Sequence, residues 1–437
     1  MSPLQSAREV ARFRGLKIGP APRCCLDSHS RIAYWRHIAA AGVLCAAIVS
    51  APALTIWNPS VRTNAYIAML QCFVVFTMLP ELSREVRSAL DGSLAFRVIV
   101  IGFLICTTGW LAQGISVGDI DRTLFYAIQP MFVLAAKAWF YRTDSNNLHR
   151  IYYFKLWATV GAIAYLFIML WLAAVPDLDW RQAKWLPIYR NIRHLDYDLA
   201  IVALLGTACW MARPLKRQHL NWGLFVLLGY VSVWSAGRGQ ILTFICFLVV
   251  YVALIRSRQM RWTLLRPSAA FMLGSALFCM LNPEMALWIL GRSSTGSVDE
   301  ISSGRVTIWI RALETVLAAN WQGIVLGLGP DAFMRHAIAP GLVQPHNVIV
   351  QIVLEFGLFG LAIVGLLVVD LAKRCRQMLV DSNASVLVTG AVSALLALLF
   401  YSMIDGVFYH ASPFLASMLL IAFILSRDQR TEARARS

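Results

Sequence analysis

The short segment Pro345-His346-Asn347 carries the most suggestive chemistry in the sequence, because it opens a long apolar stretch. Proline suits the first turn of a helix, where its missing N–H would be unpaired anyway, so we expect His346 and Asn347 in that turn. Free amides and the positive end of the helix dipole attract anions there and lower the pKa of an imidazole. A neutral histidine can accept a proton, so His346 is a candidate general base. The alternative interpretation is an ordinary histidine at the membrane interface.

A polar stripe continues along the same stretch. Asn347, Gln351 and Glu355 are spaced i, i+4, i+8 and share one face of the predicted helix. A carboxylate that faces lipid is expensive, so this face should point into protein or water. Gly357 and Gly360 are expected to allow close packing against another helix. The pattern leaves open whether Glu355 orders a cavity or acts in it.

Arg238 lies in the sequence "SAGRG" at 235–239. A single helix over 219–255 would be about 55 Å long, too long for a bilayer core of about 30 Å, so we expect Gly237 and Gly239 to break it. Arg238 would then be held at the membrane boundary beside Ser235, as a guanidinium fork for a phosphate oxygen. The alternative interpretation is a snorkelling arginine.

Arg305 lies in "SSGRVTIW", within the long segment 291–345. The apolar pattern after Ser303-Gly304 predicts a helix on the membrane surface, with Arg305 in its first turn. An arginine at a helix start opposes the dipole, which suggests another use, such as anion binding. Arg335 and His336, further along, are weaker candidates that also fit solvated loop positions.

Other polar residues flank the predicted spans on the same side. Asp405, near Tyr401 and His410, could orient an imidazole or a sugar hydroxyl, although a solvated turn fits as well. Two Asp-X-Asp patterns raise the possibility of a divalent metal, but such triplets are common by chance and we predict no metal site. Candidates for binding acceptor phosphates are Arg190, Arg193 and His194.

The elements that position these residues follow from composition. The chain has 437 residues, 59% hydrophobic and 14% charged, which excludes a water-soluble fold and predicts an all-α polytopic membrane protein. With about 20 apolar residues per span, the sequence contains about twelve transmembrane segments. They cover 36–57, 63–80, 94–113, 123–141, 151–175, 197–212, 219–236, 239–255, 268–290, 346–372, 384–403 and 408–426.

The distribution of lysine and arginine predicts that both termini are cytoplasmic. Basic inner loops that meet anionic lipid explain most of the net charge of +16 without nucleic acid. The sequence shows no Walker loop and no zinc motif, so ATP hydrolysis and structural zinc are unsupported. The expected organisation is a cytoplasmic tail (1–35, not a cleaved signal), nine spans (36–290), a long periplasmic loop (291–345), three spans (346–426) and a cytoplasmic tail (427–437).

Four motifs in this order, "SAGRG", "SSGRVTIW", "GLGPDAF" and "QPHNVIVQIVLEFGLFG", resemble the O-antigen ligase and polymerase superfamily. The resemblance covers roughly residues 190–372 and is strongest in the last motif. The family motif usually has serine immediately before its central Arg-Gly, where this sequence has Gly237, so a role for that hydroxyl is in doubt.

The resemblance implies a lipopolysaccharide O-antigen ligase with glycosyltransferase C-type architecture in the bacterial inner membrane. Such an enzyme moves a glycan from undecaprenyl pyrophosphate to lipid A-core, inverting and without metal, nucleotide or other cofactor. By motif, Arg238 and Arg305 correspond to pyrophosphate-binding arginines and His346 to the catalytic histidine. Three alternatives stay open: an O-antigen polymerase, a protein O-glycosyltransferase, and a non-enzymatic transporter of lipid-linked glycans, which no internal repeat supports.

Overall fold

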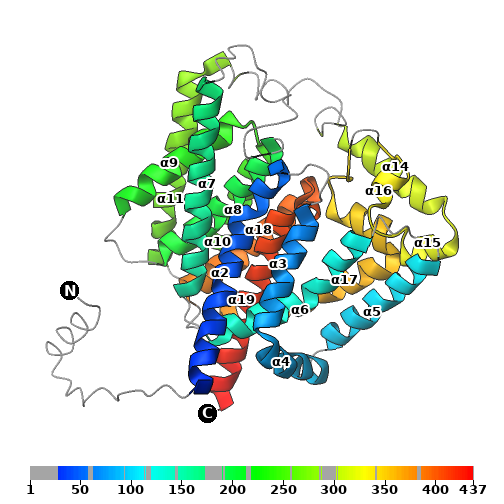
Figure 1. Cartoon of the computed structure of the whole chain (residues 1–437). Coiled ribbons are helices and arrows are strands. Elements are labelled where there is room, and N and C mark those ends of the chain that lie inside the picture. Colours follow the sequence, from blue (N-terminus) through cyan, green and yellow to red (C-terminus); the bar gives the residue numbers. More distant parts are fainter. Residues whose placement is uncertain are drawn as a thin grey trace.

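The structure is a computed structural model, and it describes residues 28–57, 63–92, 94–112, 114, 120–142, 146–172, 189, 192–212, 218–255, 258–284, 287, 302, 304–339, 342–380 and 385–436. Within these residues the regular structure is helical and includes no strand, which confirms the all-α prediction (Figure 1).

The principal helices each cover one of the predicted apolar segments. They are α2 (Ser28–Trp57), α3 (Thr63–Thr77), α5 (Leu94–Ala112), α6 (Ile120–Arg142), α7 (Asn146–Leu172), α8 (Ile192–Met211), α9 (Gln218–Trp234), α10 (Arg238–Leu254), α11 (Arg258–Leu281), α17 (Val348–Val380), α18 (Val386–Ile404) and α19 (Ala411–Arg436). Shorter helices are α4 (Leu79–Gly92), α14 (Arg305–Leu317), α15 (Trp321–Leu326), α16 (Ala332–Arg335) and η3 (Val407–Tyr409).

Several of these helices can cross a membrane. Among the described residues, six are long and apolar enough to do so: parts of α6, α7 and α11, and α17, α18 and most of α19. Helices α3 and α4 meet at 91° and would add a seventh if they form one broken span, while α5, α9 and α10 are shorter apolar helices. The chain is therefore a polytopic membrane protein, and the count of twelve spans stays a prediction.

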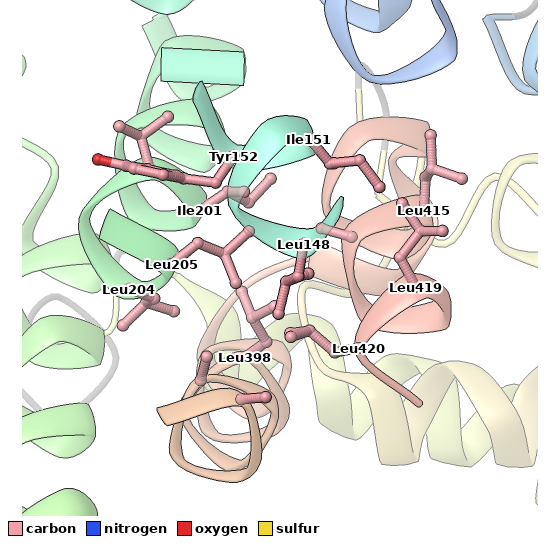
Figure 2. Packing of buried hydrophobic residues seen from close by; sticks show 14 of the residues in the cluster. Leu148, Ile151, Tyr152, Ile201, Leu204, Leu205, Leu398, Leu415, Leu419 and Leu420 are labelled. Carbon is pink, nitrogen blue, oxygen red and sulfur yellow. The ribbon is translucent and has the colours of Figure 1, made fainter. Parts of the chain in front are cut away.

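The part of the hydrophobic core that bears on the site lies where α7, α8, α18 and α19 meet. Figure 2 shows leucine, isoleucine and tyrosine side chains from these four helices converging, among them Leu148, Ile201, Leu398 and Leu419. Burial of such side chains fixes α8 against the α18–α19 pair. This packing positions two residues of the site, because Arg193 lies in the first turn of α8 and Asp405 lies in the turn that joins α18 to α19.

Two local predictions are wrong. Helix α17 begins at Val348, so His346 and Asn347 precede it instead of lying in its first turn. At the α9–α10 junction the left-handed residue is Ala236 (φ 55°), Gly237 precedes the helix, and Gly239 is already helical. Glycine is the usual residue for positive φ, so the sequence pointed to the wrong positions within a correctly predicted break.

Gly357 breaks α17 near its start. Its dihedrals (φ 68°, ψ −168°) interrupt the helix, and the carbonyls of Leu354 and Glu355 accept hydrogen bonds from Leu328 N (2.8 Å) and Gly329 N (3.1 Å). Backbone groups freed inside a membrane helix need such partners. A side chain at 357 would collide with the backbone at the end of α15. The predicted close approach is therefore present at Gly357, whereas a side chain at Gly360 would meet Phe356 of its own helix.

Replacing Gly357 with Ala should lower the free energy of unfolding by at least about 2 kcal/mol, from positive-φ strain and the collision with α15. The control is Gly365→Ala on the same helix, where an added Cβ meets no atom within 4 Å. Alanine favours helix there, so the control should be neutral or slightly stabilising. Thermal unfolding in detergent measures both variants, and equal melting temperatures would contradict the role of Gly357.

Candidate active site

Five segments that are far apart in the chain meet around His346. They are the start of α8, the α9–α10 junction, the start of α14, the loop before α17, and the turn between α18 and α19. Figure 1 shows α14 and α16 beside α17, at the end of the molecule away from the C-terminus. Each segment contributes a polar residue at a helix end, where the backbone leaves the apolar bundle.

The central contact joins His346 to Asp405. His346 Nδ1 lies 2.8 Å from Asp405 Oδ1, and His346 is only 5% exposed. An ionised carboxylate only accepts, so Nδ1 carries the proton and Nε2 keeps its lone pair. His346 has a positive φ of 56°, a conformation that costs free energy and concentrates at functional sites. The ring is thus held in one tautomer by a buried acid.

Asp405 has further donors and a nearby cation. Tyr197 Oη donates to its Oδ1 at 3.1 Å, and the Gly406 amide donates at 2.7 Å. Arg305 Nη2 lies 3.6 Å from Oδ2. Burial alone would raise the pKa of Asp405, but the bond to His346 and the two arginines Arg305 and Arg193 hold that pKa well below its usual value. Asp405 is therefore ionised at neutral pH.

The second ring nitrogen of His346 contacts Arg193. Nη1 of Arg193 lies 3.0 Å from Nε2, and a guanidinium only donates, which requires the same tautomer as Asp405 does. Burial lowers the pKa of His346, and the charges of Arg193 and Arg305 lower it further, against the opposite effect of Asp405. The imidazole is therefore neutral at pH 7.

The loop that carries His346 is fastened on both sides. Trp309 Nε1, one turn into α14, donates to the Pro345 carbonyl at 2.8 Å. Asn347 caps α17: its Oδ1 accepts from the amides of Ile349 (2.9 Å) and Val350 (3.1 Å), while its Nδ2 donates to Met403 O at 3.0 Å. Asn347 is the first residue of the polar stripe predicted from sequence, and its amide group is occupied by these bonds.

Arg305 begins α14 directly after Gly304 (φ 78°), as predicted. Arg238 begins α10 and is partly buried, and no hydrogen bond or ion pair joins its guanidinium to another described residue. Its neighbours reach the site: Gly239 packs against the Tyr401 ring and Gly237 against the Asp196 carboxylate. Arg238 is thus available for a ligand.

The chain has Gly237 where the family motif usually has serine, and a neighbouring side chain explains this difference. A Cβ there would lie 2.6 Å from Asp196 Oδ1, a buried oxygen without a hydrogen-bond partner among the described residues. Asp196 occupies the space that a serine side chain would need, so a serine at 237 would force Asp196 or Gln240 to shift. Ser235 instead bonds within its own junction, donating to Ser232 O (3.0 Å) and accepting from Gln240 Nε2 (3.0 Å).

His194 and His410 form a second histidine pair beside the site. Their ring centroids lie 4.8 Å apart, and His410 Nε2 lies 3.1 Å from Gln344 Nε2. Arg190 falls outside the described residues. Arg335 instead contacts the Leu328 carbonyl, and His336, which directly follows α16, is exposed. Sequence spacing gave no signal that His410 and Gln344 lie together.

Glu355 belongs to a separate buried network. Tyr126 Oη donates to Glu355 Oε2 at 2.8 Å, and the Asp331 amide donates to Oε1 at 3.2 Å. Arg122 donates to Tyr126 at 3.1 Å, and Tyr409 donates to Asp331 at 2.9 Å. The network ties α6, α16, α17 and η3 together, so Glu355 orders this end of the bundle.

A cavity of about 1310 Å³ extends along α17 below His346. Its walls are mostly apolar and come from α4, α5, α6, α17, α18 and α19. At one end are Gln351, Glu355 and Met403, whose carbonyl accepts from Asn347; at the other are Lys137 and Arg374. The cavity therefore begins next to the residue that follows His346, and Gln351 lines it as the predicted stripe required.

Among the described residues, no group of three or more histidine, cysteine or acidic side chains is arranged to hold a metal ion. Asp198, from one Asp-X-Asp pattern, is paired with Lys155 at 2.6 Å, and Ser412 donates to it at 2.7 Å. Asp177 and Asp179, of the other pattern, lie outside the described residues.

Comparison with known proteins gives a match to a family model. Residues 223–365 match the family model described as O-Antigen ligase, a segment that includes Arg238, Arg305 and His346. No curated protein matches the chain. This segment of the chain is therefore similar to the O-antigen ligase family.

Proposed function

We propose that the protein is an O-antigen ligase of the bacterial inner membrane. It transfers a glycan from undecaprenyl pyrophosphate to a hydroxyl of lipid A-core at the periplasmic face, and both termini are cytoplasmic. The observation that carries this proposal is His346, a neutral imidazole fixed by Asp405 among arginines, two residues before the first residue of α17 that lines an apolar cavity.

The reaction proposed is a single inverting displacement. The acceptor O–H breaks as its proton passes to Nε2 of His346, and the oxygen forms a bond to the anomeric carbon. The bond from that carbon to the phosphate oxygen breaks, and its electron pair leaves with the diphosphate. Asp405 stabilises the imidazolium that forms, as a buried acid does for a catalytic histidine.

Arg238 and Arg305 are proposed to neutralise charge on the departing diphosphate. Arg238 is supported by the fact that its guanidinium has no partner among the described residues, and Arg305 by its position 3.6 Å from Asp405 at the start of α14. Guanidinium groups can supply this stabilisation, so we propose a reaction without metal or other cofactor.

The cavity along α17 is proposed to hold the polyprenyl tail. Its wall is apolar, and it reaches Met403, which is hydrogen bonded to Asn347 beside His346. A tail in this cavity would leave the diphosphate at the level of Arg305 and His346. Arg190, Arg193 and His194 are proposed to meet the acceptor or donor, and Gln351, Asn347 and Ser235 to shape the cavity mouth.

Replacing His346 with Ala should reduce transfer in a purified reaction by about 10²- to 10⁴-fold, because the proton acceptor is lost. Binding of the lipid-linked donor should change little. His336→Ala, which replaces an exposed histidine directly after α16, is the matched control and should transfer normally. Normal transfer by the His346 variant would refute its assignment as the base.

The rate of transfer should depend on pH through His346. Because burial and the arginines lower its pKa, the neutral base persists below the usual histidine value of about 6.5, and activity should fall only at lower pH. Asp405→Asn removes the carboxylate that raises the pKa of His346 and fixes its tautomer. In this variant the loss of activity at acid pH should therefore occur at a lower pH than in wild type, and the rate of transfer should fall about 10²-fold or more. Asp370→Asn, at the other end of the cavity, is the control. An unchanged rate and profile for the Asp405 variant would contradict this role.

A deletion strain distinguishes the proposed ligase from its alternatives. Ligase function predicts that the lipopolysaccharide ladder loses every O-antigen band, including the band with a single repeat. Retention of only that band would indicate a polymerase. An unchanged ladder with a glycan missing from a protein would indicate a protein glycosyltransferase. A transporter should remain functional in the His346→Ala strain.

A further inference from the structure

Arg193 occupies the nitrogen of His346 that the proposed reaction needs. Its Nη1 lies 3.0 Å from Nε2, and because a guanidinium has no acceptor atom, the contact uses the imidazole lone pair. Nδ1 is already protonated toward Asp405. The His346 ring therefore has no free lone pair in the empty protein.

The other charged and titratable groups around His346 have partners other than Nε2. Asp405 holds Nδ1, Arg305 lies against the far oxygen of Asp405 at 3.6 Å, and His410 is paired with Gln344 at 3.1 Å. Only a movement of Arg193 or of the ring would release the lone pair, and the ring is fixed by Asp405 on a buried loop.

Arg193 is placed to move. It belongs to the first turn of α8 and is exposed, whereas His346 and Asp405 are buried. Arg193 contacts His346, and Arg305 lies 3.6 Å from Asp405, so the two guanidinium groups both flank the His346–Asp405 pair. An arginine binds a phosphate through two charge-assisted bonds, which are stronger than one bond to a neutral imidazole.

We propose that Arg193 caps Nε2 of His346 in the empty protein and moves to the diphosphate when the lipid-linked donor binds. The base then becomes available only after the donor is in place, which imposes an order on the reaction. This inference rests on the proposed function and adds a residue that controls the base. It assigns Arg193 to the donor rather than to the acceptor.

The test is the titration of His346 by NMR in full-length protein with nitrogen-15 histidine, reconstituted in lipid nanodiscs. Four samples are compared: wild type and Arg193→Met, each with and without inorganic pyrophosphate as the probe. Methionine matches the length of the arginine stem but donates no hydrogen bond. Arg311→Met, which removes an exposed arginine of α14 that has no recorded contact with His346, controls for the lost charge.

In wild type, pyrophosphate should raise the pKa of His346, because it removes the cap and brings a negative charge. In Arg193→Met the pKa should already be higher without pyrophosphate, and pyrophosphate should move it less than half as far as in wild type. Arg311→Met should behave as wild type. Arg193→Leu, which also donates no hydrogen bond, is a second neutral variant if the methionine variant unfolds at a lower temperature.

Three results would overturn the proposal. They are an unchanged His346 pKa in Arg193→Met, an equal effect of pyrophosphate on wild type and variant, and no effect of pyrophosphate on wild type. The titration uses no transfer reaction. If His346→Ala transfers normally but the titration gives the expected shifts, the proposed function is refuted and the cap is retained. If His346→Ala loses transfer but the titration shows none of these shifts, only the cap is refuted.

Discussion

The hydrogen bond between His346 and Asp405 is the interaction on which the rest of the site depends. It joins the loop before α17 to the turn between α18 and α19, residues separated by 59 positions. It also decides which ring nitrogen is protonated, and therefore which nitrogen faces Arg193. Because both side chains are buried, the contact is protected from water that would weaken an exposed pair.

Much of the surrounding structure holds the side chains of His346 and Asp405 in contact. The core of α7, α8, α18 and α19 places Arg193 and Asp405 at one end of the bundle, and Trp309 fastens the loop of His346 to α14. The break at Gly357 frees carbonyls that the segment after α15 then binds. Glu355 accepts a hydrogen bond from the Asp331 amide, and Asp331 in turn accepts one from Tyr409, so this network connects α17 to the turn between α18 and α19.

The parts that followed from sequence are those encoded by local spacing. Apolar periodicity located the helices, and the Ser303-Gly304 break placed Arg305 at the start of α14. The contacts of His346 could not be deduced in this way, because Arg193 lies 153 positions from it and no local pattern connects them. The cap at Asn347 was missed although its signal is local: asparagine is a preferred cap residue, and its bonds go to the nearby amides of Ile349 and Val350. The break before α10 was assigned to Gly237 and Gly239, whereas the residue with positive φ is Ala236, a conformation that residue type does not predict for alanine.

The central claim is that His346 is neutral with its proton on Nδ1. The most direct measurement is the pair of nitrogen-15 chemical shifts of the His346 ring at pH 7 in the protein without ligand. The account predicts one protonated nitrogen, Nδ1, and one unprotonated nitrogen, Nε2, that accepts a hydrogen bond. Two protonated nitrogens, or a proton on Nε2, would contradict it.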